Sequence, residues 1–456
     1  MQFYAFFCDI ISRKCPCNPK FTKRNLTLLL LTSLTYHTQL LFPMLRKIRI
    51  VLAGISLLLI TLLFLDFTGT LHAYLGWLAK IQLVPALLSG SLIVLIALVV
   101  LTLLFGRVYC SVICPLGILQ DVIAWMGKKA KKNRYAFSPS RWRTRLEFMF
   151  VFLLALFMSI PGIHFVASLL EPYSAFGRIA TNLLAPLWQW GNNALAYFAE
   201  RSESYAFYET EVWMRSLWSV GIAVATLIVV GIFAWRGGRT YCNTICPVGT
   251  LLGCVTLLSK KFMFRPVIDT TKCNGCRLCE RNCKGACIDS KTHTIDYSRC
   301  VMCMDCIGKC KRGAIRYVAG AVKPVAVKPA SASDEAPASE TRRAFITGAV
   351  TLAATSVVSA QKKKVDGGLA VIEDKVAPQR QTTILPPGAK DIRHFTKACT
   401  ACQLCISACP NQVLRPSDSL ERFMQPEVGY ERGYCRPECT SCSNVCPTGA
   451  LTALTR

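Results

Sequence analysis

The chain has 456 residues, of which 52% are hydrophobic and only 17% are charged. The formal net charge of +27 lies largely beside apolar runs, which favours control of membrane topology over binding of nucleic acid. The 25 cysteines fall in tight strings within a long chain, which argues against the disulfide framework of a small secreted domain.

Residues 44–262 are expected to form an α-helical membrane domain. About 20 apolar residues suffice for a helix to cross a bilayer. Residues 1–43 fit this pattern poorly, so we treat them as an N-terminal extension, with a fifth span as the alternative. The four predicted transmembrane helices are Ile48–Phe67, Leu83–Phe105, Leu146–Pro161 and Leu217–Trp235.

Lysines and arginines set the predicted orientation. Basic stretches precede the first span, lie between the second and third, and follow the fourth, as in "LRKIR", "GKKAKKNRY" and "WRGGR". By the positive-inside rule these segments are cytoplasmic. The loop 162–216 is then expected outside.

Two Cys-Pro motifs, "GRVYCSVICPLGIL" (106–119) and "GRTYCNTICPVGTL" (238–251), each follow an apolar run. A proline disfavours helix at the residue before it, so each motif should end its span and present two thiols at the inner surface. The motifs end the second and fourth spans on the same side. The thiols of Cys110, Cys114, Cys242 and Cys246 can therefore converge as a redox dithiol, a soft-metal site or a docking floor, or be simply buried small residues.

Residues 263–317 are predicted to form a ferredoxin-like domain with two clusters. "CNGCRLCERNC" and "CVMCMDCIGKC" both read C-x2-C-x2-C-x3-C, the bacterial two-cluster pattern in which the fourth cysteine of each string binds the other cluster. Zinc sites instead use pairs with long separations. The predicted ligand sets are Cys273, Cys276, Cys279 and Cys310 for one [4Fe–4S] cluster, and Cys300, Cys303, Cys306 and Cys283 for the other.

A linker (318–340) rich in Ala, Pro and Ser precedes a segment (341–361) that resembles a twin-arginine export signal, followed by a second linker (362–394). Residues 395–456 then contain "CTACQLCISACP" and "CRPECTSCSNVCP", which predict a second two-cluster domain and four clusters in all. The expected fold class is thus a helical membrane domain with two small α+β ferredoxin-like domains. The ligand sets predicted here are Cys399, Cys402, Cys405 and Cys446, and Cys435, Cys439, Cys442 and Cys409.

Four spans, two "GRxYCxxICPxG" motifs and a following two-cluster unit resemble the NapH-type membrane quinol dehydrogenase iron–sulfur proteins of periplasmic nitrate reductase systems. Residues 341–456 resemble the NapG-type exported ferredoxin, with fewer clusters. The resemblance implies quinol as electron donor and delivery of electrons to a periplasmic or membrane-associated reductase or its electron-transfer subunit. It also implies a multi-pass protein of the bacterial inner membrane, with the first ferredoxin-like unit cytoplasmic and the second periplasmic if 341–361 crosses the membrane.

Other functions stay open. The Cys-Pro motifs also resemble membrane ferredoxins of nitrous-oxide respiration regulators and of copper-handling oxidase assembly proteins, so a copper reductase or metalloenzyme-assembly factor is the alternative. A third possible function is a membrane anchor for a ferredoxin, with no catalytic activity of its own. For quinol oxidation the candidate residues are Glu171, Arg178 and His164, near the predicted outer ends of the spans, where an acidic residue suggests function.

Overall fold

The computed structural model of the chain describes residues 23–66, 68–130, 135–157, 164–204, 207–210, 212, 216–259, 264–319, 383–430 and 433–454. The twin-arginine-like segment 341–361, and the predicted linkers between residues 320 and 382, lie outside these residues. So do residues 1–22 of the predicted N-terminal extension.

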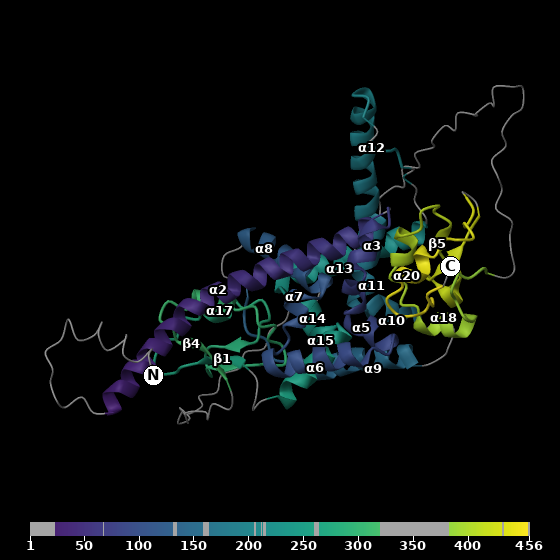
Figure 1. The fold of residues 1–456 in the computed structure, drawn as a ribbon. Coiled ribbons are helices and arrows are strands. Elements are labelled where there is room, and N and C mark those ends of the chain that lie inside the picture. Colours follow the sequence, from purple (N-terminus) through teal and green to yellow (C-terminus); the bar gives the residue numbers. More distant parts are fainter. Residues whose placement is uncertain are drawn as a thin grey trace, which may run out of the picture. The chain divides into compact units, whose positions relative to one another are not determined.

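The described chain before residue 260 is helical (Figure 1). The predicted extension runs directly into the first span, because both belong to the single helix α2. The helices are α2 (Lys23–Leu65), α3 (Thr70–Leu75), α4 (Trp77–Lys80), α5 (Leu83–Leu88), α6 (Leu92–Phe105), α7 (Tyr109–Val112), α8 (Pro115–Ala130), α9 (Trp142–Phe157), α10 (His164–Leu170), α11 (Pro172–Ile179), the π-helix η1 (Ala180–Leu184), α12 (Ala185–Arg201), α13 (Leu217–Gly237), α14 (Thr240–Thr244) and α15 (Pro247–Leu258).

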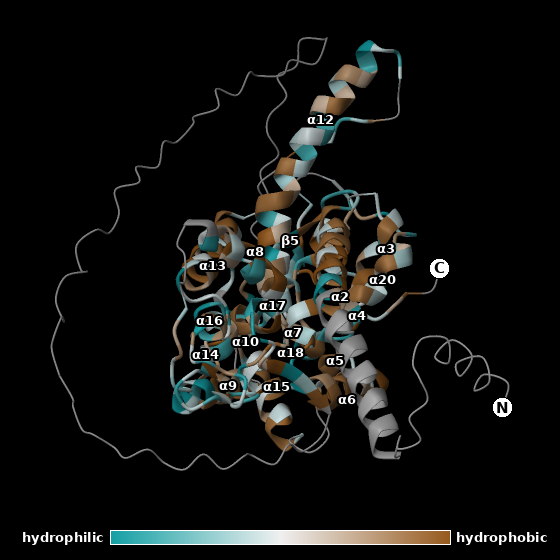
Figure 2. Ribbon diagram, turned by 90° about the vertical axis from the view of Figure 1, so that its left-hand side faces the viewer, coloured by the Kyte–Doolittle hydropathy of each residue, from teal (hydrophilic) through white to brown (hydrophobic). Residues whose placement is uncertain are grey.

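Two helices of the described chain are long and apolar enough to cross a membrane, Met44–Leu65 within α2 and Leu217–Gly237, which is α13. Less than a third of the most apolar stretch of either helix is buried within the protein. Figure 2 shows the apolar residues that predominate along α13. Outward apolar surface of this extent suits a lipid environment.

The prediction of one continuous span over Leu83–Phe105 is wrong. The chain forms α5, turns at Gly90, and resumes as α6. Gly90 has φ +70°, and the amide of Ser91 donates to the carbonyl of Ala86 at 3.0 Å. This is a Schellman ending, for which glycine is the favoured residue.

The third predicted span, Leu146–Pro161, corresponds to α9, which ends at Phe157. The predicted residues 158–161 lie outside the described chain. Neither α6, with 14 residues, nor α9, with 16, reaches the length that a straight crossing needs. The structure therefore does not show four transmembrane helices. Its described residues contain two candidates.

The first ferredoxin-like unit contains two small antiparallel sheets. β1 (Phe264–Ile268) pairs with β4 (Ile315–Ala319), with Ile268 opposite Ile315, and β2 (Ile288–Asp289) pairs with β3 (Thr294–Ile295). The short helices α16 (Leu278–Arg281) and α17 (Asp305–Lys309) complete the unit. Its small core consists of isoleucines packed against the cysteine strings.

The C-terminal unit has a comparable content. Its elements are α18 (Ile392–Ala398), α19 (Leu404–Ser407), β5 (Leu414–Pro416), the 3-10 helix η2 (Leu420–Arg422), β6 (Pro426–Val428), antiparallel to β5, and α20 (Ser441–Val445). Residues before 395 also belong to its packing, because the amide of Val428 donates to Ile384 O at 3.0 Å and that of Thr452 to Gly388 O at 2.9 Å. A helix-rich half and two small α+β units agree with the predicted fold class, apart from the number of spans.

The two ferredoxin-like units contact opposite ends of α13. At its N-terminal end, Ser216 Oγ donates to Asp418 of the C-terminal unit at 2.8 Å. Just past its C-terminal end, the Arg239 amide donates to Lys284 O of the first unit at 2.9 Å. The 21 residues of α13 span about 31 Å at 1.5 Å per residue. The units are thus separated by roughly the hydrocarbon thickness of a bilayer.

The same holds for α2. Arg46, near the start of its apolar stretch, binds Asp305 of the first unit at 2.8 Å. Near its other end, Phe64 and Cys402 of the C-terminal unit both approach Gly177 of α11. Both candidate membrane helices therefore run between the two units.

Candidate functional site

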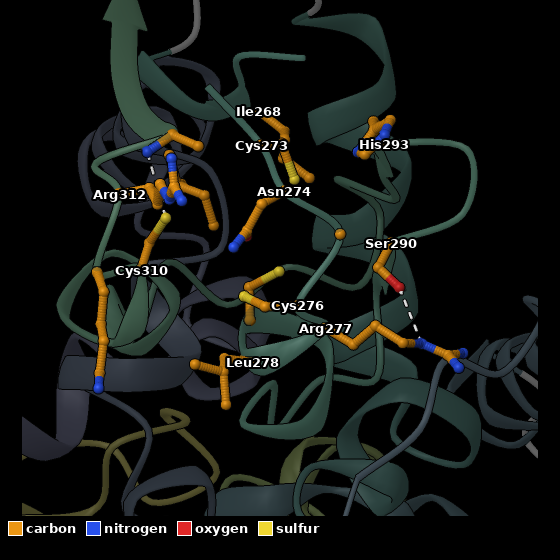
Figure 3. Close-up of a pocket in the computed structure, with 15 residues that line it drawn as sticks. Ile268, Cys273, Asn274, Cys276, Arg277, Leu278, Ser290, His293, Cys310 and Arg312 are labelled. Carbon is orange, nitrogen blue, oxygen red and sulfur yellow. Dashed lines mark hydrogen bonds between the residues drawn. The ribbon is translucent and has the colours of Figure 1, made fainter. Parts of the chain in front are cut away.

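The four cysteines predicted to hold the first cluster line one cavity, drawn in Figure 3. Cys273, Cys276 and Cys310 turn their sulfur atoms toward the same space, and Cys279 also lines it. Cys310 comes from the other string, as the crossing pattern requires. The cavity brings the predicted set together, and ligation of a cluster stays a prediction.

A second cavity is lined by Cys283, Cys300, Cys303 and Cys306, the other predicted set. Cys287 lines it too, and its sulfur lies 3.4 Å from that of Cys283. Cys287 belongs to neither of the two cysteine strings. Its place beside Cys283 makes it a neighbour of the second predicted cluster.

Three of the four strings share an unusual backbone. The residues on either side of the second cysteine have left-handed φ: +67° at Gly275 and +58° at Arg277, +51° at Met302 and +61° at Met304, +52° at Ala401 and +64° at Gln403. Non-glycine residues adopt this region at a cost of about 1–2 kcal/mol each. Alternating right- and left-handed residues turn successive N–H groups toward an anion, as in iron–sulfur sites. The strain therefore points to an anionic occupant.

The fourth string, Cys435 to Cys446, lacks this alternation among its described residues. Thr440, just after its second cysteine, has φ −115°. The extra residue between Cys435 and Cys439 changes how the loop winds. The backbone thus supports the fourth predicted cluster less than it supports the other three.

In the C-terminal unit the cysteines also group by the crossing pattern. Burial, together with the neighbouring Cys446, raises the pKa of Cys402 to about 12. Burial, and after it the charge of Cys409, raises the pKa of Cys442 to about 12. Each string thus has its last cysteine beside the other string's set.

Both Cys-Pro motifs break the helix where the sequence predicts. α7 ends at Val112 and α8 begins at Pro115, while α14 ends at Thr244 and α15 begins at Pro247. The second cysteine of each motif, Cys114 or Cys246, donates its amide to the carbonyl of its own motif's tyrosine at 3.0 or 3.1 Å. All four cysteines of the motifs are buried, with side chains 2–3% exposed.

The two motifs are tied together by a reciprocal pair of arginines. Arg107 of the first motif donates to the carbonyl of Cys242 at 3.1 Å, and Arg239 of the second donates to the carbonyl of Cys110 at 2.6 Å. Both arginines are fully buried. The motifs are therefore related by a pseudo-twofold arrangement in which each completes the other.

The last glycine of each motif serves the same contact. A Cβ added at Gly117 would collide with Cys110 O, and one added at Gly249 would collide with Cys242 O. Glycine is thus required for close backbone approach. The arginine, the tyrosine, the second cysteine, the proline and the last glycine of the motif each have a structural role. What the motif cysteines bind is a separate question.

The first ferredoxin-like unit is anchored to these motifs. Lys284 forms ion pairs with Asp121 of α8 at 3.6 Å and with Asp305 of its own unit at 3.3 Å. Arg107 donates to Ser298 O at 2.9 Å. Lys284, which directly follows Cys283, thus anchors the first unit to α8, while the role of the four motif thiols stays a prediction.

Glu171 is 1% exposed, although the sequence placed it near water. Its carboxylate caps α11 by accepting the amides of Tyr173, at 3.2 Å, and Ser174. Burial raises its pKa in spite of these bonds. Arg178 is also buried and binds Ser168 O at 3.0 Å rather than Glu171. His164 begins α10, but its side chain lies outside the described atoms.

A narrow cleft places Glu171 beside the C-terminal unit. It is lined by Glu171 and Ser168, by Cys399, Thr400 and Lys397 of that unit, and by the apolar residues Val84, Phe152, Leu156 and Ala167. Cys399 is a predicted ligand of the third cluster. The cleft is the one place among these cavities where a candidate quinol residue and a candidate cluster ligand meet.

Comparison with known protein families indicates which cofactor these cysteines bind. A family profile described as a 4Fe-4S binding domain matches residues 88–133 and 217–265, which contain both Cys-Pro motifs. A second, described as a 4Fe-4S dicluster domain, matches residues 398–450. These matches show that the chain carries 4Fe-4S-type domains, in line with the predicted iron–sulfur clusters. They cover the Cys-Pro motifs and the predicted second ferredoxin-like domain, but not the cysteine strings of the first, and they do not give the number of clusters.

Individual relatives agree. YccM of Escherichia coli, named for electron transport, is 25% identical over 231 residues, which cover 50% of this chain and 55% of YccM. The ferredoxin-type protein NapH of E. coli is 25% identical over 242 residues, 49% of this chain and 69% of NapH. The methylamine utilization ferredoxin-type protein MauM of Methylophilus methylotrophus is 38% identical over 93 residues, 19% of this chain and 39% of MauM. No solved structure matches.

The chain thus spans about half the length of YccM. The resemblance to NapH-type iron–sulfur proteins is confirmed at low identity, and with it a place among proteins of electron transport. The residues around the motif cysteines, namely Arg107, Arg239, Gln120 and Asp121, could not be singled out from the sequence. The only available signal was the repeated "GR" at the start of each motif.

Proposed function

We propose that this protein oxidises quinol at a membrane and passes the electrons through its iron–sulfur clusters to a redox partner outside the cytoplasm. The cleft between α5, α9, α10 and the C-terminal unit carries this proposal. It joins apolar walls, a buried carboxylate and a predicted cluster ligand, Cys399. These are the properties that a quinol oxidation site needs, because the quinol ring is apolar while its oxidation releases protons and electrons together.

In the cleft, Glu171 accepts a proton from the quinol hydroxyl and Lys397, from the C-terminal unit, offsets the charge nearby. Quinol gives up two protons, which Glu171 takes up one after the other and passes to water, and two electrons, and it leaves as quinone. Iron–sulfur clusters supply one-electron acceptors when bound. The cleft as it stands is narrow, so the walls formed by Phe152 and Leu156 must move apart to admit a ring.

The contacts at the ends of α2 and α13 support placing the two units on opposite sides of the membrane. The positive-inside rule then assigns the first unit, beside the basic segments, to the cytoplasm. The C-terminal unit and the Glu171 cleft face outward, where a periplasmic or membrane-associated reductase, or its electron-transfer subunit, takes the electrons.

The test is the variant Glu171→Gln in the purified full-length chain with its clusters intact. A soluble quinol analogue should reduce the wild-type clusters, and the variant should be at least 10²-fold slower, in line with the loss of a proton acceptor. The measured signal is the bleaching of iron–sulfur absorbance.

The matched control is Glu200→Gln, which removes an exposed carboxylate from α12 and should leave the rate unchanged. Dithionite should reduce the clusters of all three proteins alike, which shows that the clusters are present. A wild-type chain that quinol cannot reduce, or an E171Q variant as fast as wild type, would contradict the proposal.

A further inference from the structure

The proposed function leaves the first ferredoxin-like unit without a task, because the Glu171 cleft lies beside the C-terminal unit. We propose that the surface around Cys276 of the first unit is a docking face for an acidic electron-transfer protein of the cytoplasm, which delivers electrons to the first predicted cluster. The docking face itself stands on exposure and charge. Its cytoplasmic location and its use as an electron entry rest on the proposed function.

A predicted cluster ligand reaches the surface at this face. Among the described cysteines, Cys276 alone is exposed. Its neighbours Asn274 and Gly275 are exposed too. Figure 3 shows Cys276 at the cavity that it shares with Cys273 and Cys310. The residues that would hold the first cluster therefore extend to the protein surface, where a partner's redox centre can come close.

The rim of this cavity is basic. Lys272, Lys311 and Arg312 are exposed, and the last two also line the cavity. Arg277, which follows Cys276 directly, is exposed as well. The docking face thus consists of Cys276 and Asn274 surrounded by these basic side chains.

Carboxylates do not offset this charge at the surface. Among the described residues of the first unit, every acidic side chain is buried or half-buried. Asp269 pairs with Arg316 at 2.6 Å, and Asp305 pairs with Lys284 at 3.3 Å. A surface of one sign steers a partner of the opposite sign toward it and disfavours partners of its own sign. The docking face therefore favours an acidic protein.

The described surface of the C-terminal unit differs. Exposed carboxylates lie among its exposed cations, for example Asp391 beside Lys390 and Glu438 near Arg436. The high net charge of the chain therefore does not by itself explain the docking face. The one-sided charge belongs to the unit that the positive-inside rule assigns to the cytoplasm.

A lipid surface fits the docking face less well than a protein does. The first unit meets the membrane half through other residues, since Lys284 pairs with Asp121 at 3.6 Å and Phe264 stacks on Phe105 at the end of α6. Neither Lys284 nor Phe264 lines the cavity of Figure 3. A lipid-binding surface commonly combines cations with exposed apolar side chains. Among the described residues of the unit, Phe264 is the one large apolar side chain that is exposed.

The step at this face is the transfer of one electron. The partner's reduced flavin or iron–sulfur centre loses one electron, and the first cluster, when bound, gains it. No bond forms or breaks. Complexes of this kind are transient and bury less than about 1,200 Å², so a small face suffices.

The experiment measures the binding of a purified flavodoxin of net negative charge to the immobilised full-length chain, prepared in neutral detergent without oxygen. The variant K272E/K311E reverses two charges of the docking face. It should weaken binding at least 10-fold at low salt, mainly through a slower association rate, and the difference should shrink as salt is added. Reduced flavodoxin should also lose its electron to this variant at least 10-fold more slowly than to wild type.

The matched control is K390E/R393E, which makes the same change of charge on exposed residues of the C-terminal unit and should bind flavodoxin as wild type does. The variant K272R/K311R keeps both charges and should also bind normally. Dithionite should reduce the clusters of every variant alike, which shows that each variant is folded and carries its clusters.

Absence of binding to wild type, unweakened binding to K272E/K311E, or equal weakening in K390E/R393E would overturn the docking face. A benzophenone side chain placed at Asn274 in inside-out membrane vesicles should cross-link to added flavodoxin. Cross-linking to phospholipid in its place would also overturn the proposal, because the face would then lie on lipid. Failure of quinol to reduce a wild-type chain that does bind flavodoxin at this face would instead reject the proposed function and leave the docking face standing.

Discussion

Asp121 is the residue on which the cations of the membrane half converge. Burial alone would raise its pKa, but Arg239 and Lys284 hold that pKa well below the usual range of a carboxyl. A carboxylate depressed in this way stabilises the fold above its ordinary pKa, and the stabilisation is lost as the pH falls. Asp121 fixes the side chain of Arg239, which in turn donates to the Cys110 carbonyl.

Replacing Asp121 with Asn should therefore destabilise the chain by about 3–5 kcal/mol, because it leaves buried cations without their counter-charge. The measurement is the midpoint of thermal unfolding in detergent at neutral pH. The difference from wild type should shrink as the pH is lowered through the carboxyl range, since wild type then loses the same charge.

The comparison variant is Glu147→Gln, which changes an exposed carboxyl of α9 and should alter stability by less than about 0.5 kcal/mol. Equal midpoints for D121N and wild type at neutral pH would mean that Asp121 carries no net stabilisation.

At this scale the sequence predicts some residues and not others. Cysteine strings carry their chemistry in their own spacing, so Cys273 and its partners were predictable. Arg107 and Arg239 were not, because each acts on a carbonyl more than a hundred positions away. The burial of Glu171 was not predictable either, because it falls in the loop 162–216 expected outside and nothing in its neighbourhood indicates that α11 is buried.

Among the elements, α11 is the one that joins the membrane half to the C-terminal unit. All eight of its residues are buried, and it packs against α8 and α13. Gly177 lies so close to Cys402 O and to the Phe64 ring that an added Cβ would collide with both. A short hydrophobic helix in a predicted loop gave no signal of this role.

Gly177→Ala should therefore loosen the C-terminal unit, at a cost of about 1–3 kcal/mol for overpacking. Limited proteolysis should release a fragment containing the 383–454 region faster than from wild type. Gly191→Ala in α12 is the matched control, because its added Cβ meets nothing within 4 Å. There the same change should stabilise by up to about 1 kcal/mol, and equal proteolysis of both variants would argue against the contact.

The broken segment Leu83–Phe105 shows a different limit of prediction. The segment is apolar along its whole length, and apolar length is the property from which a membrane span is predicted. The Ser-Gly-Ser interruption at Ser89, Gly90 and Ser91 allows a Schellman turn, but a single glycine within an apolar run is also tolerated in helices that cross membranes. Only the hydrogen bonds around Gly90 decide between the two.

For the whole molecule, the central feature is that α2 and α13 each contact the first unit at one end and the C-terminal unit at the other. This shared pattern of the two helices is the basis on which we propose that one unit lies on each face of a membrane.

A protease added to intact spheroplasts should therefore degrade an epitope fused after Arg456 while leaving the first unit intact, as detected with an antibody against residues 264–319. Both should be degraded after lysis. Protection of the C-terminal epitope in intact spheroplasts would place both units on the cytoplasmic side and contradict outward delivery of electrons.

The reciprocal arginines also bear on how the protein matures. Arg107 finds its acceptor on Cys242, and Cys110 finds its donor on Arg239, so neither motif is complete until the ribosome has made the second. A chain with one copy would have to borrow the other from a neighbouring molecule. The two halves thus behave as a homodimer whose subunits have been joined in one gene, and any metal at their interface has to be inserted after both halves have met.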